Sequence, residues 1–214
     1  MKKTLLIILA IVVVAWIFVV GKYNTLVKYD ETVKTAWSQV ENVYQRRLDL
    51  IPNLVNTVKG AAAQESGVLV AVVNARANAT KVTVDINDAA SLAAYQKVQG
   101  EVSSSLSKLL AVVENYPTLQ SIQAFRDLMT QLEGTENRIT VERKNFNDAV
   151  NTLNIYIRRF PANIVAAMFN FEKALQFEAN EWADVAPTVD FGTTTTVPTD
   201  TIPTEWTDTE TVAQ

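Results

Sequence analysis

Apolar residues recur every three or four positions through most of the chain after residue 25, with polar residues between them. A repeat of about 3.5 residues is typical of helices that pack along a shared seam. The first such stretch predicts a long helix over residues 22–66, with a kink at Pro52. Its apolar residues occupy two positions of a seven-residue repeat: Leu26, Val33, Val40, Leu54 and Ala61 on one, and Trp37, Tyr44, Ile51 and Val58 on the other.

Three more helices are expected further along the chain. A short helix is predicted over residues 68–78, and the polar side chains of residues 85–88 can cap the helix that follows. That third helix keeps the same apolar spacing until Pro117 ends it. The fourth carries the clearest repeat and is expected to run unbroken over residues 118–160. The sequence therefore predicts an all-α fold, an antiparallel, four-helix-like bundle of long helices over residues 22–186.

A last helix is predicted over residues 162–182. If the long helices run antiparallel, the chain has returned toward its N-terminal end by residue 160. Packing on the base of the bundle is the simpler interpretation of the apolar side chains here, and contact with lipid or a partner is the alternative. The aromatic candidates for that contact are Phe169, Phe171, Phe177 and Trp182.

The composition changes at Pro187 to threonine, proline and acidic residues, without a single Lys or Arg. Such a segment buries too little apolar surface to offset the entropy of ordering it. Residues 187–214 are therefore predicted to form a disordered tail.

An uncharged apolar run occupies residues 4–21, with two lysines in the short flank of residues 1–3 and Lys22 after it. Eighteen residues at about 1.5 Å each just cross a bilayer core of roughly 30 Å. We expect an uncleaved, single-pass transmembrane anchor that continues directly into the first helix of the bundle. A signal peptide is the alternative, although no small-residue cleavage pattern follows the run. The residues expected to face lipid include Leu5, Leu6, Ile7, Ile8, Trp16 and Phe18.

The composition excludes several kinds of catalytic and binding site. The chain contains no Cys and no His, which excludes thiol and imidazole catalysis and most transition-metal sites, so no cofactor is expected. It lacks the basic patch that nucleic-acid binding requires, and no phosphate-binding glycine loop occurs. Ser104 and Lys108 lie four residues apart, as a Ser/Lys hydrolase would need, but a solvated helix surface explains that spacing better. We expect no enzymatic activity and identify no small-molecule substrate.

Three charged residues fall on the apolar positions of the repeat: Arg47 in the first helix, and Glu136 and Arg143 in the fourth. Charges at core positions are costly unless they are paired. In an antiparallel pair, Arg47 and Glu136 are nearly equidistant from the distal end, so they should lie at the same height. The alternative is that the arginines extend to water from the edge of the seam. The predicted buried polar layer consists of Arg47, Glu136, Arg143, Glu41, Asn42 and Asn137.

Two blocks of the sequence resemble the bacterial LemA family. The first is Glu-Asn-Val-Tyr-Gln-Arg-Arg-Leu-Asp-Leu-Ile-Pro-Asn-Leu-Val at residues 41–55, and the second begins Gly-Thr-Glu-Asn-Arg-Ile at residues 134–139 and continues through Phe160-Pro-Ala-Asn. The resemblance implies a bacterial membrane protein with one span and a helical bundle. It implies no enzymatic activity, and some members are tied to organelle-like membrane structures.

These observations lead to two functional hypotheses. In the first, the protein is a structural or interaction protein of the inner membrane that binds the lipid bilayer and self-associates or recruits protein partners. In the second, it is an accessory or regulatory subunit of an envelope protease, transporter or signalling system. The signal-like N-terminus favours an extracytoplasmic bundle, although lysines flank the span on both sides.

Overall fold

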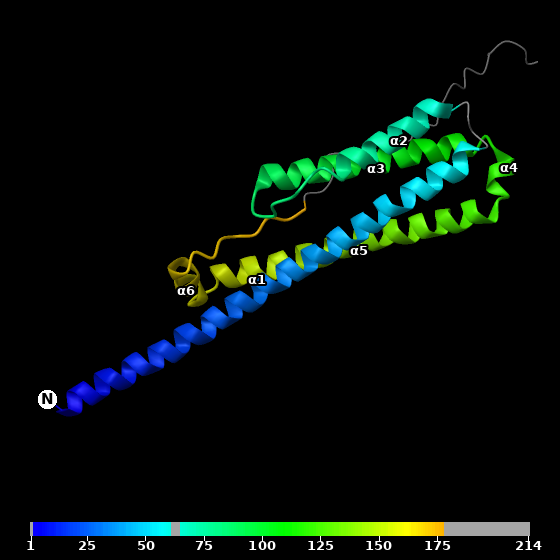
Figure 1. The fold of residues 1–214 in the computed structure, drawn as a ribbon. Helices are drawn as coiled ribbons and strands as arrows, with labels where there is room; N and C mark the ends of the chain where they lie inside the picture. The colour runs from blue at the N-terminus through cyan, green and yellow to red at the C-terminus, as the bar shows by residue number, and fades with distance from the viewer. Residues whose placement is uncertain (1, 61–64, 178–214) are drawn as a thin grey trace, which may run out of the picture. The chain divides into compact units, whose positions relative to one another are not determined.

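The computed structural model describes residues 2–60 and 65–177, and the regular elements in these ranges are all helices (Figure 1). The predicted all-α fold is therefore confirmed for the described part of the chain. Trp182 and the predicted tail of residues 187–214 lie outside the described residues. The helices are α1 (Lys2–Lys59), α2 (Ser66–Ala79), α3 (Ala89–Val113), α4 (Pro117–Gln120), α5 (Gln123–Arg158) and α6 (Ala162–Met168).

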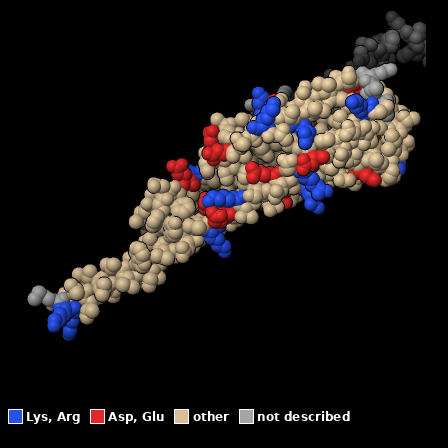
Figure 2. Space-filling model, viewed as in Figure 1, with Lys and Arg blue, Asp and Glu red and all other residues tan. Residues whose placement is uncertain are grey.

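Helix α1 joins the apolar run to the bundle in one uninterrupted element of 58 residues. Residues 2–18 are exposed on every side, and buried positions begin at Leu26 and recur with the predicted spacing. Charged side chains are scattered over the bundle, whereas the protruding part of α1 is uncharged beyond the lysines at its tip (Figure 2). The predicted continuity between anchor and bundle is thus confirmed.

Pro52 lies inside α1 without ending it. Proline has no amide hydrogen, so the carbonyl four residues earlier, that of Leu48, loses its helical donor. The Nε of Arg76 on α2 donates to that carbonyl at 2.8 Å. A second helix therefore supplies the hydrogen bond that Pro52 removes from the first.

The predicted end of this helix at residue 66 is wrong. Helix α1 ends at Lys59, and Ser66 begins α2 instead. Gly60 follows the last helical residue, and glycine weakens a helix because it loses the most backbone freedom on folding.

Helices α1 and α5 form the long antiparallel pair at the centre of the bundle. Near the distal end, they pack with α2 and α3 around one apolar cluster that includes Leu54, Val72, Leu109 and Leu132. Closer to the apolar run, α2 is absent, and a second cluster unites α1, α3 and α5 with residues 82–86 and 174–177. The bundle thus has four helices over only part of its length.

The fourth predicted helix is divided in two. Helix α4 lasts one turn and buries Leu119, and α5 begins at Gln123. Between them, the Ser121 hydroxyl donates to the carbonyl of Thr118 at 2.7 Å, and Ile122 adopts extended backbone angles. Such local hydrogen bonds compete with helix propagation, which explains the break. The predicted cap of α3 is present, since the Asp88 carboxylate accepts from the amides of Ala90 and Ser91.

The predicted last helix stops early. Helix α6 ends at Met168, Asn170 has a φ of 55°, and the amide of Phe171 donates to the carbonyl of Ala166 at 2.9 Å. This is the usual way in which a residue in the left-handed region terminates a helix. Residues 171–177, here called the strap, are not helical and lead away from α6 alongside α5 (Figure 1).

Candidate functional site

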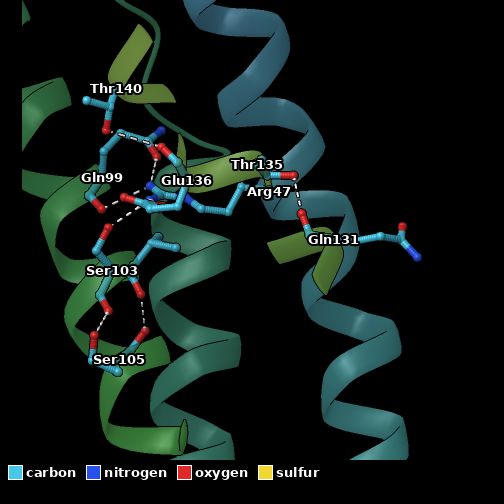
Figure 3. Close-up of polar contacts among 10 residues, drawn as sticks. Arg47, Gln99, Ser103, Ser105, Gln131, Thr135, Glu136 and Thr140 are labelled. Carbon is cyan, nitrogen blue, oxygen red and sulfur yellow. Dashed lines mark hydrogen bonds and ion pairs between the residues drawn. The ribbon is translucent and has the colours of Figure 1, made fainter. Parts of the chain in front are cut away.

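Arg47 is the centre of the most polar part of the core, with only 1% of the residue exposed. Its Nη1 donates to Glu136 Oε2 at 3.0 Å and to Ser103 Oγ at 2.7 Å, and its Nη2 donates to the side-chain oxygen of Gln99 at 2.7 Å (Figure 3). Nη2 also donates to the Gln99 carbonyl at 3.1 Å. One guanidinium from α1 therefore links α3 and α5. We call these four residues the Arg47 cluster.

The local sequence explains why these groups meet. Arg47 occupies a core position of α1, Gln99 occupies a core position of α3, and Glu136 faces them from α5. A guanidinium suits this role because its planar fork of donors can serve several acceptors at once. Its Nε is buried and has no hydrogen-bond partner among the described residues.

The energetic value of the cluster is limited by solvent on one side. The Glu136 side chain is 54% exposed, so water screens its attraction to the arginine. Burying the charge of Arg47 has a cost that the ion pair offsets only in part, whereas removing one partner would leave a buried donor unsatisfied. The arrangement is therefore better suited to fixing the alignment of three helices than to adding stability.

A cavity of about 450 Å³ opens beside the cluster, between α3 and α5. Asn137, one of the residues predicted for the polar layer, lines this cavity and is exposed. Glu41 and Asn42 are also exposed, and they line a separate, smaller cavity of about 220 Å³ with Tyr44 and Tyr95. Among the described residues, the hydrogen bonds of Arg47 go to the members of the Arg47 cluster and to none of these three.

Arg143, the third predicted charge, lies at a different place in the fold. Its guanidinium carbon is 4.7 Å from the centre of the Phe177 ring, on the strap. Arg143 is seven residues from Glu136, a rise of about 10 Å along α5, which carries it toward the second apolar cluster, nearer the apolar run.

Both Arg47 and Arg143 influence the pKa of Tyr44. Burial raises the pKa of its hydroxyl, and the positive charges of Arg143 and Arg47 partly counter that rise. Burial likewise raises the pKa of Tyr95, and the neighbouring Tyr44 adds to the effect. The rings of the two tyrosines meet edge to face at 5.5 Å. Both hydroxyls therefore stay protonated at neutral pH, next to the Arg47 cluster.

The described part of the chain has one helix long and apolar enough to cross a membrane, and that stretch of α1 is not buried against the rest of the protein. The side chains predicted to face lipid are exposed, from 44% for Phe18 to 69% for Leu5 and Trp16. Lys22, at the end of the run, lies 5.4 Å from the centre of the Phe18 ring. This is the arrangement that a membrane anchor requires.

The aromatic residues predicted as membrane or partner contacts separate into two groups. Phe177 is buried in the core, where it stacks on Trp37 at 5.6 Å and meets Phe146 edge to face. Phe169 and Phe171 instead contact Tyr23, just after the apolar run, at ring distances of 4.7 and 6.0 Å. Of the three that are described, Phe177 belongs to the core, and Phe169 and Phe171 lie beside the end of the apolar run.

A family model described as the LemA family matches residues 36–191. The chain belongs to the LemA family. Magnetosome proteins MamQ 1 and MamQ 2 of Paramagnetospirillum magneticum are each 30% identical to it over 200 residues, which cover 84% of this chain and 74% of each relative. Magnetosome protein MamQ of Magnetospirillum gryphiswaldense is 26% identical over 182 residues, covering 76% of this chain and 67% of the relative.

The part of the chain that matches the LemA family contains the whole Arg47 cluster and the strap, while the apolar run precedes it. Sequence reasoning missed several residues within this part. Gln99 falls on the apolar positions of α3, between Tyr95 and Val102. A polar residue at an apolar position is the same signal that identifies Arg47, so the sequence pattern also points to Gln99. Asn147 and Asn154, which hold the strap, lie seven residues apart inside a helix, where asparagine is unfavourable without a special role.

Proposed function

We propose that this LemA family member is a membrane-anchored scaffold of the bacterial envelope. In this proposal, residues 4–21 cross the inner membrane, the bundle lies on the extracytoplasmic side, and the protein acts by binding other copies of itself or other proteins. The observation that carries the proposal is the single helix α1, which joins an exposed apolar run to the bundle without a break. An apolar surface of this size requires a non-aqueous environment.

The relatives support the same class of function. The three MamQ proteins are named as magnetosome proteins, which favours a role in organising a membrane-bounded assembly. The interior of the bundle also supports an architectural role, since the hydrogen bonds of Arg47 join three helices. Ser104 and Lys108 both lie on the exposed surface of α3, as an ordinary solvated pair would.

Cross-linking in intact membranes tests the scaffold. A photo-reactive residue would be placed at exposed positions of α3 and α5, such as Ser104 and Asn151, and the products identified by mass spectrometry. We expect links mainly between copies. The same links should persist when the purified protein is reconstituted and then diluted with lipid, because chance collisions would decline on dilution. A reproducible link to one foreign envelope protein, without links between copies, would favour the accessory-subunit hypothesis instead.

Cysteine labelling tests the orientation, because the chain has no cysteine to compete with an introduced one. Ser104→Cys should react with a membrane-impermeant maleimide in intact cells, whereas Lys3→Cys, before the span, should react only after the membrane is opened. The reverse result would place the bundle in the cytoplasm.

A further inference from the structure

Helix α6 lies against α1 where the apolar run ends. Val165 and Ala166 pack with Leu26, and Val19 adjoins the same small cluster. Val19 belongs to the proposed span and Leu26 follows it by seven residues, so these contacts bracket the end of the run at Gly21. Helix α6 is therefore held at the level where the hydrocarbon core meets the lipid headgroups.

The opposite face of α6 is apolar and exposed. Phe160 comes just before α6, and Ile164 and Met168, four residues apart, lie on one side of the helix. They are 77%, 52% and 63% exposed, and the neighbouring Phe169 is 47% exposed. We call these four residues the base patch. The buried side of α6 packs on α1, so packing within the bundle leaves the base patch uncovered.

The surroundings of the base patch favour a lipid surface over a protein partner. Arg158 and Arg159, both exposed, come directly before it, and Lys22 follows the span on α1. Apolar side chains flanked by basic residues are typical of elements that lie in a membrane interface, where the basic groups meet anionic headgroups. Glu172, on the strap, is the nearby acidic exception among the described residues. The figures agree, since α6 is drawn nearly end-on beside α1, and uncharged surface extends from the anchor onto the base of the bundle (Figures 1 and 2).

We propose that the base patch inserts into the interface of the same bilayer that α1 crosses. The protein would then contact lipid at two places, through the span and through α6, and the second contact would fix the rotation of the bundle about the span. This inference rests on the proposed membrane anchor, and the experiment below separates the two.

Three single-cysteine variants with nearly equal exposure of the native side chain provide the test: Leu9→Cys in the span at 56%, Ile164→Cys in the base patch at 52%, and Val141→Cys on α5 at 54%. Each full-length variant would carry an environment-sensitive fluorophore. Each would be placed in nanodiscs of phosphatidylethanolamine and phosphatidylglycerol at one chain per disc. Quenching by nitroxide-labelled lipid would then be compared with quenching by aqueous iodide. Circular dichroism would verify that all three retain their helix content.

We expect lipid quenching at Leu9 and Ile164 that exceeds the value at Val141 roughly twofold or more, with iodide quenching in the opposite order. Lipid quenching at Leu9 but equal behaviour of Ile164 and Val141 would overturn the inference and leave the anchor intact. Absence of lipid quenching at Leu9 would overturn the anchor as well. One chain per disc ensures that protection of Ile164 cannot come from a second copy.

Discussion

Asn147 pairs through its side-chain amide with both backbone polar groups of Phe177: it accepts from the Phe177 amide at 2.9 Å and donates to its carbonyl at 3.2 Å. Asn154 pairs with Ala174 in the same way, at 2.9 Å for each bond. The spacing explains the match, since three extended residues and seven helical residues both span about 10 Å. The two asparagines thus give the strap the hydrogen bonds that a neighbouring strand would otherwise provide.

Replacing Asn154 with alanine should destabilise the protein by about 1–3 kcal/mol, because two partly buried backbone groups of Ala174 would lose their partners. Urea unfolding in detergent micelles would measure the change. Asn151→Ala is the matched control, since that asparagine is exposed on the same helix. Equal effects of the two substitutions would show that the hydrogen bonds between Asn154 and the strap contribute no stability.

The pairing of Arg47 with Glu136 should appear as energetic coupling. Arg47→Met and Glu136→Met should each destabilise the fold by about 1–3 kcal/mol, and the double variant should be more stable than their sum predicts by about 1 kcal/mol. The physical reason is that the second substitution removes a group that the first has already left without its partner. Strictly additive effects in thermal or urea unfolding would exclude the coupling.

A surface pair provides the control for that cycle. Lys144 and Asp148 also form an ion pair, at 2.8 Å, but both side chains are mostly exposed. Solvent screening and side-chain entropy should make their coupling too small to detect in the same assay.

Arg76 should matter only because of Pro52. In the native sequence, Arg76→Met should cost about 1–2 kcal/mol, since the Leu48 carbonyl loses its charged donor. In a Pro52→Ala background, the restored amide at position 52 can bond that carbonyl, so the same substitution should cost clearly less. Urea unfolding of the four proteins measures both values. An unchanged cost would show that Arg76 acts through packing alone.

The fold should lose stability at alkaline pH because of Tyr44 and Tyr95. Burial raises the pKa of both hydroxyls, so above about pH 10 the unfolded chain releases protons that the folded chain retains. Stability is thus fully present below that pH and declines as the pH rises toward the folded-state values. Replacing both residues with phenylalanine should move the alkaline unfolding midpoint upward, as followed by circular dichroism. An unmoved midpoint would contradict this account.

The repeat of apolar residues predicted the long helices and the shared height of Arg47 and Glu136, because both follow from regular helical rise. Helix ends were less predictable, since each depends on one local contact. Ser121 diverts a hydrogen bond, and Asn170 adopts a left-handed conformation that the aromatic spacing around it conceals. The strap was missed for a different reason: its hydrogen-bond partners lie 20 to 30 residues earlier in the sequence.

The polar core shows the same difference between what helical periodicity predicts and what depends on tertiary contacts. Charge on an apolar position identified Arg47, but its acceptors on α3 depend on which helices become neighbours. The placement of Arg143 against Phe177 also required the path of the strap, which periodicity alone cannot supply.

Because α1 is one unbroken helix, a tilt at its N-terminal end displaces its far end. From the end of the apolar run to Lys59, the helix extends about 57 Å at its normal rise. If the apolar run tilts by about 10° in a bilayer, as a membrane-spanning helix does when bilayer thickness changes, the far end of α1 moves sideways by about 10 Å. Bilayer thickness would then set the lateral position of the far end of α1.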